Sequence, residues 1–250
     1  MKPSASKLAG AVVALAIACA PLSAAYAQNR TATDAQGQAL KVQGSVVLIE
    51  PDIELSLVSA GGLAEPRKEW SDAARKLYPQ AVRELLAGSK AERRDDYDVP
   101  DDLDPNSQMG QIVRLNQAVA LSISQYNLGG ALATKKDAHT GKPRMDWSLG
   151  PGVAGLREAT GADYALFTYI RDSYATGGRT AVRVLTLLAG AALGAYIDVG
   201  GGSQVGVATL VDLRTGQVVW FNQMVKGSGD LRDEKGAKGT VASMLKGIPL

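Results

Sequence analysis

The stretch that decides the fold is VGVATLVDLRTGQVVWFNQMV, residues 205–225, because it contains the clearest local pattern in the chain. Val205–Leu213 and Gln217–Val225 are rich in β-branched and aromatic residues, a composition typical of strands. Arg214-Thr215-Gly216 lies between them and has the composition of a short turn, in which glycine takes positive φ without steric cost. The stretch therefore predicts an antiparallel hairpin near the carboxyl end.

Strand and helix patterns mix in the rest of the chain. Ser45–Ile49 is a continuous apolar run of the kind found in strands buried on both faces, and Glu50-Pro51 is expected to end it. Apolar residues at steps of three and four predict a helix from Glu65 to Gly88, which Pro79 should kink or split. Further predictions are a charged, solvated loop at 91–106, helices at Gln108–Leu128, Thr180–Ile197 and Thr240–Leu245, and a strand at Ala162–Ile170. This mixture predicts an α/β (α+β) fold, a mixed sheet with a C-terminal antiparallel hairpin and with helices packed on the sheet.

The amino-terminal residues have the pattern of an export signal. Lys2 and Lys7 supply positive charge, Leu8–Ala20 is uncharged and apolar, and Ala25-Tyr26-Ala27 has the small residues of a cleavage site. The apolar run is shorter than the roughly 20 residues that a membrane-spanning helix needs. We therefore predict a signal peptide at residues 1–27, a flexible leader at 28–43 and a single periplasmic α/β domain at 44–250.

A second processing site overlaps the first. Ala16-Ile17-Ala18-Cys19 is similar to a lipobox, although alanine replaces the usual leucine at its first position. Cleavage before Cys19 leaves a lipid anchor and an outer-membrane location. Cleavage after Ala27 removes the only cysteine and leaves a soluble periplasmic protein without thiols or disulfides. The sequence leaves both outcomes open.

The balance of charge argues against one class of partner. Removal of residues 1–27 takes Lys2 and Lys7 from the 27 basic residues and leaves 25 of them against 25 acidic residues. A nucleic-acid or anionic-lipid surface needs a clustered excess of lysine and arginine, which this sequence lacks. We therefore expect no nucleic-acid partner, and we expect no transmembrane helix in the mature chain.

The hairpin and the strand before it resemble a known periplasmic domain. Gly161-Ala162-Asp163-Tyr164 precedes an apolar strand, and Asp212-Leu213-Arg214-Thr215-Gly216 leads to Trp220. These features are similar to the α/β domain of the curli-secretion lipoprotein family and of the amino-terminal domain of the Tol-system propeller protein, and uncharacterised proteobacterial lipoproteins share the hairpin. The resemblance covers residues 155–225, and residues 44–90 more loosely.

The resemblance implies an α/β fold and a role in envelope secretion or transport. It does not imply pore formation, because Ser173–Gln204 lacks the polar–apolar alternation of strands that insert into the outer membrane. The residues themselves require only structural roles. Asp212 is placed to bond the backbone of the turn, and Trp220 is expected to cover the edge of the sheet.

Two groups of residues are candidates for binding. Glu50, Asp52 and Glu54 follow a buried strand, where α/β proteins often bind ligands, and they form a candidate ligand loop. Gly190 and Gly194 form a G-x-x-x-G motif in the uncharged segment Val184–Ile197. As a helix this segment is about 21 Å long and too short to cross roughly 30 Å of hydrocarbon. It is either a core helix or a self-association surface, because its small residues allow close packing.

The candidate catalytic motifs are incomplete. Gly150–Gly155 matches the dinucleotide fingerprint in spelling, but a polar loop leads into it instead of a strand. Ser203 lies in an elbow-like sequence that precedes a strand, and His139, the only histidine, lies in an exposed turn. Ser243 and Lys246 have S-x-x-K spacing without the supporting motifs of that enzyme class. We therefore predict no catalytic, cofactor-binding or metal-binding residues and no enzymatic activity.

Three functional hypotheses follow. The first is a non-enzymatic cell-envelope protein that acts by assembly, as a subunit or accessory of a secretion or transport system, with itself or other envelope proteins as partners. The second is a periplasmic small-ligand-binding domain with a pocket near Glu50, and the third is a hydrolase that uses Ser203 and His139. The missing catalytic set and the resemblance favour the first.

Overall fold

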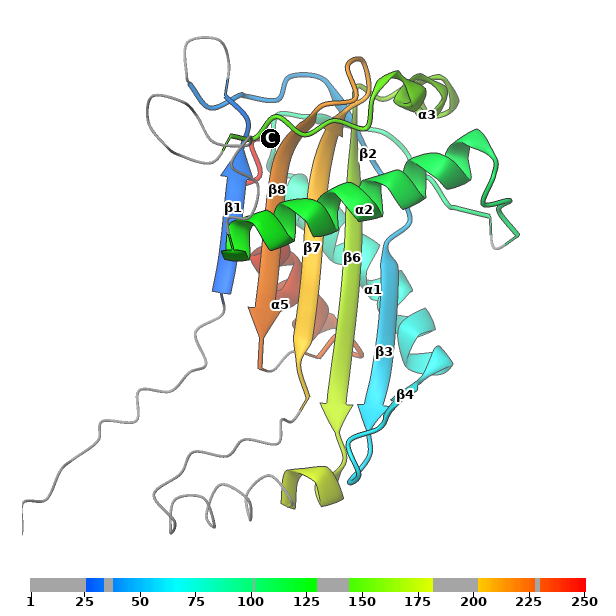
Figure 1. The fold of residues 1–250 in the computed structure, drawn as a ribbon, viewed down its shortest axis with the longest axis vertical. Coiled ribbons are helices and arrows are strands. Elements are labelled where there is room, and N and C mark those ends of the chain that lie inside the picture. Colours follow the sequence, from blue (N-terminus) through cyan, green and yellow to red (C-terminus); the bar gives the residue numbers. More distant parts are fainter. Residues whose placement is uncertain (1–25, 34–37, 101, 130–143, 182–201, 228–229) are drawn as a thin grey trace, which may run out of the picture.

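The computed structural model describes residues 26–33, 38–100, 102–129, 144–181, 202–227 and 230–250 (Figure 1). They form a mixed eight-stranded sheet with helices on both faces. In chain order the elements are β1 (Tyr26–Thr31), β2 (Ser45–Leu48), β3 (Asp52–Val58), β4 (Ala64–Pro66), α1 (Lys68–Leu86), β5 (Glu92–Arg93), α2 (Gln108–Gly129), the 3-10 turn η2 (Pro151–Val153), α3 (Ala154–Thr160), β6 (Tyr164–Ala175), β7 (Gln204–Asp212), β8 (Val218–Lys226) and α5 (Glu234–Met244). The predicted α/β fold class is confirmed, with β7 and β8 as the antiparallel hairpin.

The long strand β6 organises the sheet. Antiparallel β7 pairs with it from Tyr164↔Asp212 to Asp172↔Gln204, and β8 and β1 follow on that side. On its other side β6 pairs in parallel with β2 along its first half and with β3 along its second half. The two short strands therefore occupy one position in the sheet, with a break between them at residues 49–51. At this break the chain after β5 leaves the sheet, after a last bridge between Ile49 and Tyr97.

The hairpin turn closes through Asp212, as the sequence predicts. Its Oδ1 accepts a hydrogen bond from the Arg214 N–H at 2.8 Å, and its carbonyl accepts one from the Gly216 N–H at 2.7 Å. Gly216 has φ of 75°, a left-handed conformation that favours glycine. The predicted position of Trp220 is wrong, because this side chain is fully buried in the core and not at the sheet edge. Phe221, the next residue, points into the core on the opposite face, as alternation along a strand requires.

Each face of the sheet has its own hydrophobic core. Behind the sheet in Figure 1, α1 and α5 pack on a core that includes Leu166, Ile170 and Trp220. In front, α2 and α3 pack on a second core that includes Phe167 and Phe221. Since both faces of β6, β7 and β8 carry buried residues, these strands are the centre of the molecule.

Polar contacts fix α2 to the front face. The Asn116 amide of α2 donates to Thr209 Oγ1 of β7 at 2.9 Å, and both residues are fully buried. The hydroxyl of Tyr169 on β6 donates to Asn116 Oδ1 and to the carbonyl of Val113, each at 3.1 Å. The network joins one helix to two strands, so it sets both the position of α2 and its rotation about its axis.

Some predicted elements differ from the structure. The sequence predicts a flexible leader at 28–43, whereas Tyr26–Thr31 is the edge strand β1 and pairs with β8. Pro79 lies inside α1 without splitting it. The closing helix α5 begins at Glu234, earlier than predicted, because the Asp233 side chain caps it by accepting from the Gly236 N–H at 2.7 Å. Among the described residues, no helix has both the length and the hydropathy to cross a bilayer.

Candidate functional site

The structure separates the residues of the predicted ligand loop. Glu50 lies in the break between β2 and β3 and lines a charged cleft. Asp52 and Glu54 do not lie in a loop, because they belong to β3 and pair with Tyr169 and Arg171 of β6. The other predicted residues, Cys19, Gly190 and Gly194, lie outside the described part of the chain.

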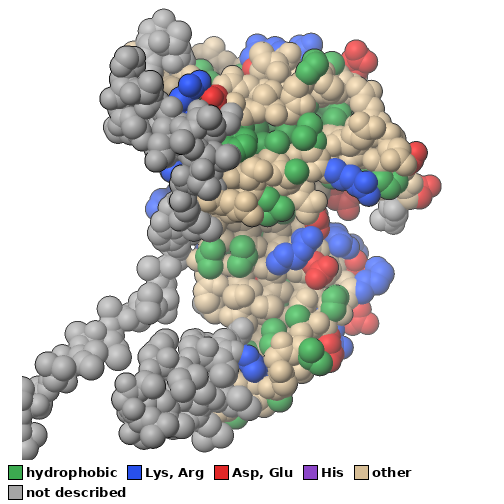
Figure 2. Space-filling model, in the orientation of Figure 1, with side chains coloured by type: hydrophobic (Ala, Val, Ile, Leu, Met, Phe, Trp, Pro, Cys, Tyr) green, Lys and Arg blue, Asp and Glu red, His purple; other side chains and the backbone are tan. Residues whose placement is uncertain are grey.

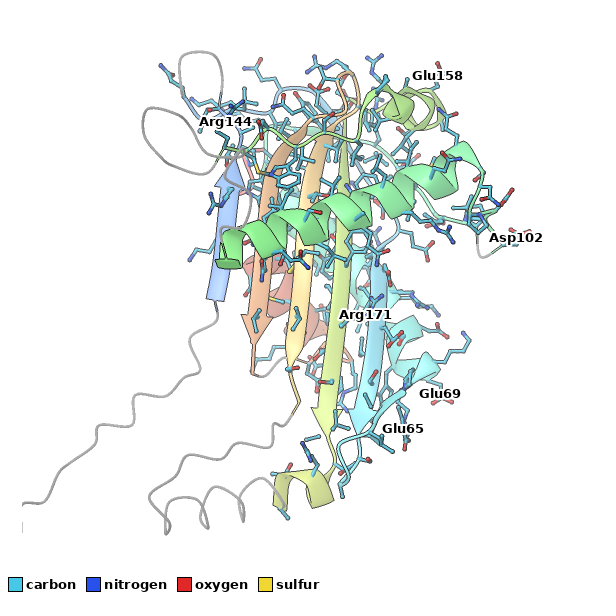
Figure 3. All side chains as sticks on the ribbon, viewed as in Figure 1. Glu65, Glu69, Asp102, Arg144, Glu158 and Arg171 are labelled. Carbon is cyan, nitrogen blue, oxygen red and sulfur yellow. The ribbon has the colours of Figure 1, made fainter. Side chains whose placement is uncertain are left out.

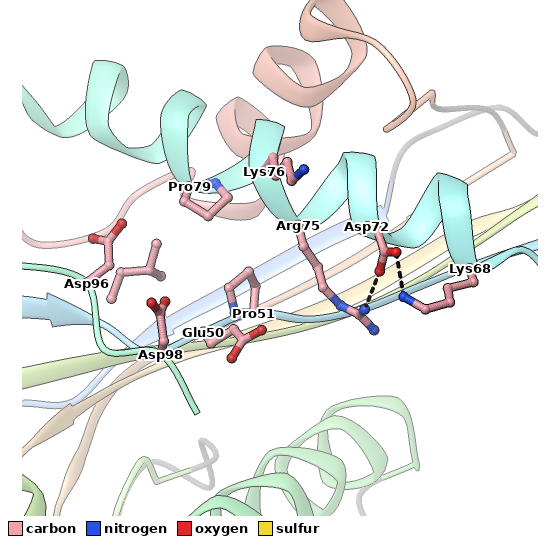
Figure 4. A pocket seen from close by; sticks show the side chains of 10 residues that line it. Glu50, Pro51, Lys68, Asp72, Arg75, Lys76, Pro79, Asp96 and Asp98 are labelled. Carbon is pink, nitrogen blue, oxygen red and sulfur yellow. Dashed lines mark hydrogen bonds and ion pairs between the residues drawn. The ribbon is translucent and has the colours of Figure 1, made fainter. Parts of the chain in front are cut away.

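The charged cleft lies where α1 passes over the break between β2 and β3 (Figure 4). Its volume is about 490 Å³, which is within the usual range of small-ligand sites. One wall consists of α1 side chains spaced three and four residues apart, and hence on one helix face: Lys68, Asp72, Arg75, Lys76 and Pro79. The opposite wall contains Glu50 and Pro51 from the break, and Asp96 and Asp98 from the segment after β5.

Ion pairs hold part of the cleft wall in place. Asp72 accepts hydrogen bonds from Lys68 Nζ at 2.6 Å and from Arg75 Nη1 at 3.1 Å, and the bond from Lys68 lowers the pKa of this carboxyl below its ordinary value. On the other wall, Asp96 accepts from Arg83 at 2.5 Å. Glu50 accepts from the Val99 N–H with Oε2 at 2.9 Å, so its carboxylate is fixed at the edge of the cleft.

A second surface is the lower half of the front of the sheet, which we call the open sheet face. It consists of front-facing residues of β6, β7 and β8 below α2: Arg171, Ser173, Val205, Val207, Gln223 and Val225. Figure 1 shows that none of the described helices lies in front of this half of the sheet. Val205 is 42% exposed and Val225 37% exposed, although both lie on interior strands.

A shallow groove runs between the open sheet face and α2. Its volume is about 180 Å³, and its lining includes Leu121 of α2 and Val205 and Val207 of β7. Leu121 is 53% exposed, so the apolar surface extends from the strands onto the helix. Figure 2 shows apolar side chains on this front face with basic and acidic side chains beside them.

A bidentate ion pair borders the groove. Arg171, labelled in Figure 3 below α2, donates to both carboxylate oxygens of Asp52 at 2.8 and 3.0 Å. The hydrogen bond to Asp52 raises the pKa of Arg171 further above its ordinary value. Glu54 is the register partner of Arg171 on β3 and adds a second negative charge beside it. The charged residues of this surface therefore lie on β3 and β6, and the valines lie on β7 and β8.

A buried carboxyl lies on the opposite face of the same strands. Asp172 is 2% exposed, and its Oδ2 accepts from the Tyr174 hydroxyl at 2.5 Å and from Gln204 Nε2 at 2.8 Å. Burial raises the pKa of Asp172 above its ordinary value. Gln204 in turn accepts from Thr240 of α5 at 2.9 Å, and Tyr174 accepts from the Leu231 N–H at 2.9 Å. This chain of bonds connects the ends of β6 and β7 to α5 and to the segment before it.

The candidate catalytic motifs take part in local structure. The Ser203 N–H donates to Ser173 Oγ at 2.9 Å, and Ser243 Oγ donates to the Gly239 carbonyl within α5 at 2.9 Å. Gly150–Gly155 spans η2 and the start of α3 and follows a loop, not a strand. His139 lies outside the described residues, and the part of the chain that is described contains no group of three His, Cys, Asp or Glu placed to hold a metal ion.

Comparison with known proteins gives only distant structural similarities. No protein-family model matches the chain, and no curated protein matches it. A PelC chain from a dodecamer of Paraburkholderia phytofirmans is 14% identical with a TM-score of 0.38, and the match covers 90% of this chain and 97% of that chain. A methionine-substituted PelC dodecamer from the same organism gives 12% identity, a TM-score of 0.36 and coverage of 88% and 98%. At these scores we take no conclusion about function from the similarity.

Sequence reasoning missed most of the residues of both surfaces. The cleft side chains of α1 have a sequence signal, because Lys68, Asp72 and Lys76 follow each other at steps of four on the side of the helix away from its apolar residues. Asp98 has no such signal, since its place near α1 depends on the pairing of β5 with β2. The valines of the open sheet face lie in a predicted strand, but the sequence does not show which face of that strand a helix covers.

Proposed function

We propose that this protein is a non-enzymatic component of the cell envelope that acts by assembly with copies of itself through the open sheet face. The observation that supports this most is the exposure of Val205 and Val225 on interior strands of the sheet, at 42% and 37%. Contiguous apolar surface on a folded protein commonly marks an interaction site. Here it continues onto Leu121 of α2, which is 53% exposed.

A second copy suits the distribution of charge on this face. Two sheets pack face to face through apolar side chains on their inner faces, and valines on β7 and β8 supply such side chains. In a two-fold interface the same patch serves both copies, so the valines of one copy face the valines of the other. The nearby Arg171 is already paired with Asp52 of its own chain, so burial beside the interface leaves no arginine charge uncompensated.

The predicted export signal favours an envelope location, and its two predicted processing sites affect β1 differently. Tyr26 and Ala27 pair with Val225 and Met224 of β8. Cleavage after Ala27 removes these two residues and exposes the backbone of β8 beside the open sheet face, whereas cleavage before Cys19 keeps β1 whole and adds a lipid. Intact mass of protein recovered from the envelope fraction distinguishes the two, and a mass that retains Met1–Ala18 contradicts export through either site.

The oligomeric state tests the proposal. We expect light scattering during size-exclusion chromatography to show an oligomer of the wild type, and a monomer for a Val205→Lys, Val225→Lys double variant that retains its circular dichroism spectrum. A Leu63→Lys, Leu85→Lys variant is the matched control, because these leucines are 72% and 42% exposed and lie outside the open sheet face. A monomeric wild type, or equal effects of the two double variants, contradicts assembly through this face.

Glycine variants separate the open sheet face from the surface predicted from the sequence. Gly190→Leu and Gly194→Leu replace the small residues of the uncharged segment with large ones and leave the valines unchanged. We expect both variants to remain oligomeric. If they are monomeric while the double lysine variant remains oligomeric, the uncharged segment is the assembly surface and the open sheet face is not.

A further inference from the structure

The charged cleft behind the sheet combines both signs of charge in one cavity. Its two walls come from α1 on one side and, on the other, from the segments before and after α1, around Glu50 and Asp98 (Figure 4). It lies on the side of the sheet opposite the open sheet face and is independent of assembly. Its use therefore requires a separate explanation.

Some of these charges are already compensated. Asp72 accepts hydrogen bonds from both Lys68 and Arg75, so this carboxylate is shared by two cations and one positive charge remains in excess. Asp96 is paired with Arg83, which lies outside the lining of the cleft. The remaining charges are therefore positive on the α1 wall and negative on the opposite wall.

Two side chains of the lining make no direct polar contact within the described residues, and one of them, Lys76, interacts with Asp72 only through its charge. Lys76 of α1 and Asp98 of the opposite wall make neither an ion pair nor a side-chain hydrogen bond there. Glu50 accepts a single hydrogen bond, from Val99, through one of its two carboxylate oxygens. A cation on one wall and two carboxylates on the other are thus available to a ligand.

Pro79 leaves one backbone carbonyl of α1 without its helical donor. A proline inside a helix has no N–H, so the carbonyl four residues before it lacks its usual donor. In α1 this carbonyl belongs to Arg75, and both Arg75 and Pro79 line the cleft. Pro79 and Pro51 also make the two walls stiff, which reduces the entropy lost when a ligand is bound.

We propose that the cleft binds a small zwitterion, an α-amino acid or a short peptide, with its carboxylate toward Lys76 and its ammonium group toward Glu50 and Asp98. A simple anion is disfavoured by the two carboxylates, and a polyamine is disfavoured by Lys76 and the excess charge of the Lys68–Arg75 pair. A ligand with both charges meets a partner at each end. The cavity volume of about 490 Å³ suits a ligand of a few residues.

Trialanine and its two blocked forms test this inference directly. We expect trialanine titrated into isotopically labelled protein to shift the backbone NMR signals of α1 and of residues 96–99. N-acetyl-trialanine lacks the ammonium group and trialanine amide lacks the carboxylate, so each should bind at least tenfold more weakly. Equal binding of all three peptides, or no shift with trialanine at about 10 mM, a concentration that saturates a millimolar site, overturns the inference.

Charge-removing variants locate the site. Lys76→Gln and Asp98→Asn should each weaken trialanine binding about tenfold and should retain the spectrum of a folded protein, because both side chains are on the surface. Lys235→Gln and Glu158→Gln remove one charge of each sign from exposed positions outside the cleft and should bind as the wild type does. If the cleft variants bind as tightly as these controls, the cleft is not the site. None of these substitutions touches the open sheet face, so this result and that of the assembly experiment are independent.

Discussion

Asp172 provides the sharpest test of how the end of the sheet is held together. The carboxyl is 2% exposed, and its Oδ2 accepts hydrogen bonds from Tyr174 and Gln204. Tyr174 accepts in turn from the Leu231 N–H, and Gln204 accepts from Thr240 of α5. Loss of the carboxyl is therefore expected to loosen α5 and the segment before it as well as the strands.

The magnitude follows from the two bonds. A hydrogen bond to a charged group contributes about 1.5–3 kcal/mol, and a buried donor left without an acceptor adds to the cost of losing it. With Tyr174 only partly buried, we expect Asp172→Ala to lower the free energy of unfolding by about 2–4 kcal/mol at neutral pH. Asp172→Asn keeps an acceptor oxygen for both donors, so its cost should be under about 1 kcal/mol. Urea unfolding followed by tryptophan fluorescence measures both values.

The raised pKa of Asp172 also predicts how the stability of the protein changes with pH. Burial raises the pKa of Asp172 in the folded protein above the ordinary value of 3.8, so the folded state retains a proton that the unfolded state has released. The contribution of Asp172 to the free energy of unfolding is therefore greatest below pH 3.8. It falls as the pH rises toward the pKa of Asp172 in the folded protein, and it is constant above that pKa. Asp172→Asn does not titrate, so its stability relative to the wild type should increase over this interval.

Two results would refute this account of Asp172. The first is an Asp172→Ala variant that unfolds at the same urea concentration as the wild type, which would mean that the bonds to Tyr174 and Gln204 contribute nothing. The second is a stability difference between Asp172→Asn and the wild type that is the same at about pH 4 and about pH 7, a range that begins just above the ordinary pKa of a carboxyl. The comparison of two variants cancels the contribution of other carboxyls, such as Asp230, whose pKa is lowered by its bond from Arg232.

Two further predictions concern helix packing. In α5, Gly236→Ala should lower the melting temperature, because the added Cβ would collide with the Asp230 carbonyl. Gly239→Ala has open space around it and should stabilise the helix by about 0.5–1 kcal/mol. Scanning calorimetry measures both variants, and an equal shift of their melting temperatures contradicts this prediction. In α2, Asn116→Ala should cost about 2–4 kcal/mol because it leaves the buried Thr209 hydroxyl unpaired and removes one of the two acceptors of Tyr169. An Asn116→Ala variant that matches the wild type in urea unfolding would show that the network does not fix α2.

The parts of the fold that depend on local sequence could be predicted. The hairpin of β7 and β8 has its turn residues and its strand composition in one continuous stretch, so pairing requires no distant information. The sequence also predicts a strand at Ser45–Ile49 and a helix at Gln108–Leu128, because each pattern is local; the structure has them at Ser45–Leu48 and Gln108–Gly129. The burial of Trp220 cannot be predicted in this way, because it depends on β1, which pairs with β8, and on the core residues of distant segments.

The strands that depend on distant partners were missed. Residues 26–31 carry no apolar alternation, and β1 exists only because β8 offers its backbone hydrogen bonds at the sheet edge. In β3 apolar and polar residues do alternate, with Ile53 and Leu55 buried between polar residues. In the sequence, however, Pro51 predicts the end of the strand region. A proline ends ladder pairing only where its missing N–H is needed. At Pro51 the chain is between two strands, so the missing donor costs nothing.

The break at Pro51 also explains why a cleft exists on this side of the sheet. Before the break, β2 has neighbours on both sides, β6 and β5. After it, β3 pairs with β6 and with the short antiparallel strand β4 farther along, while the chain from β5 turns away at Tyr97. The space between the departing chain and α1 is lined by the first residues after the turn, and Asp98 is among them. Because the same few residues end one pairing and begin the next, the shape of the cleft depends on the length of the break, whereas the hairpin of β7 and β8 does not.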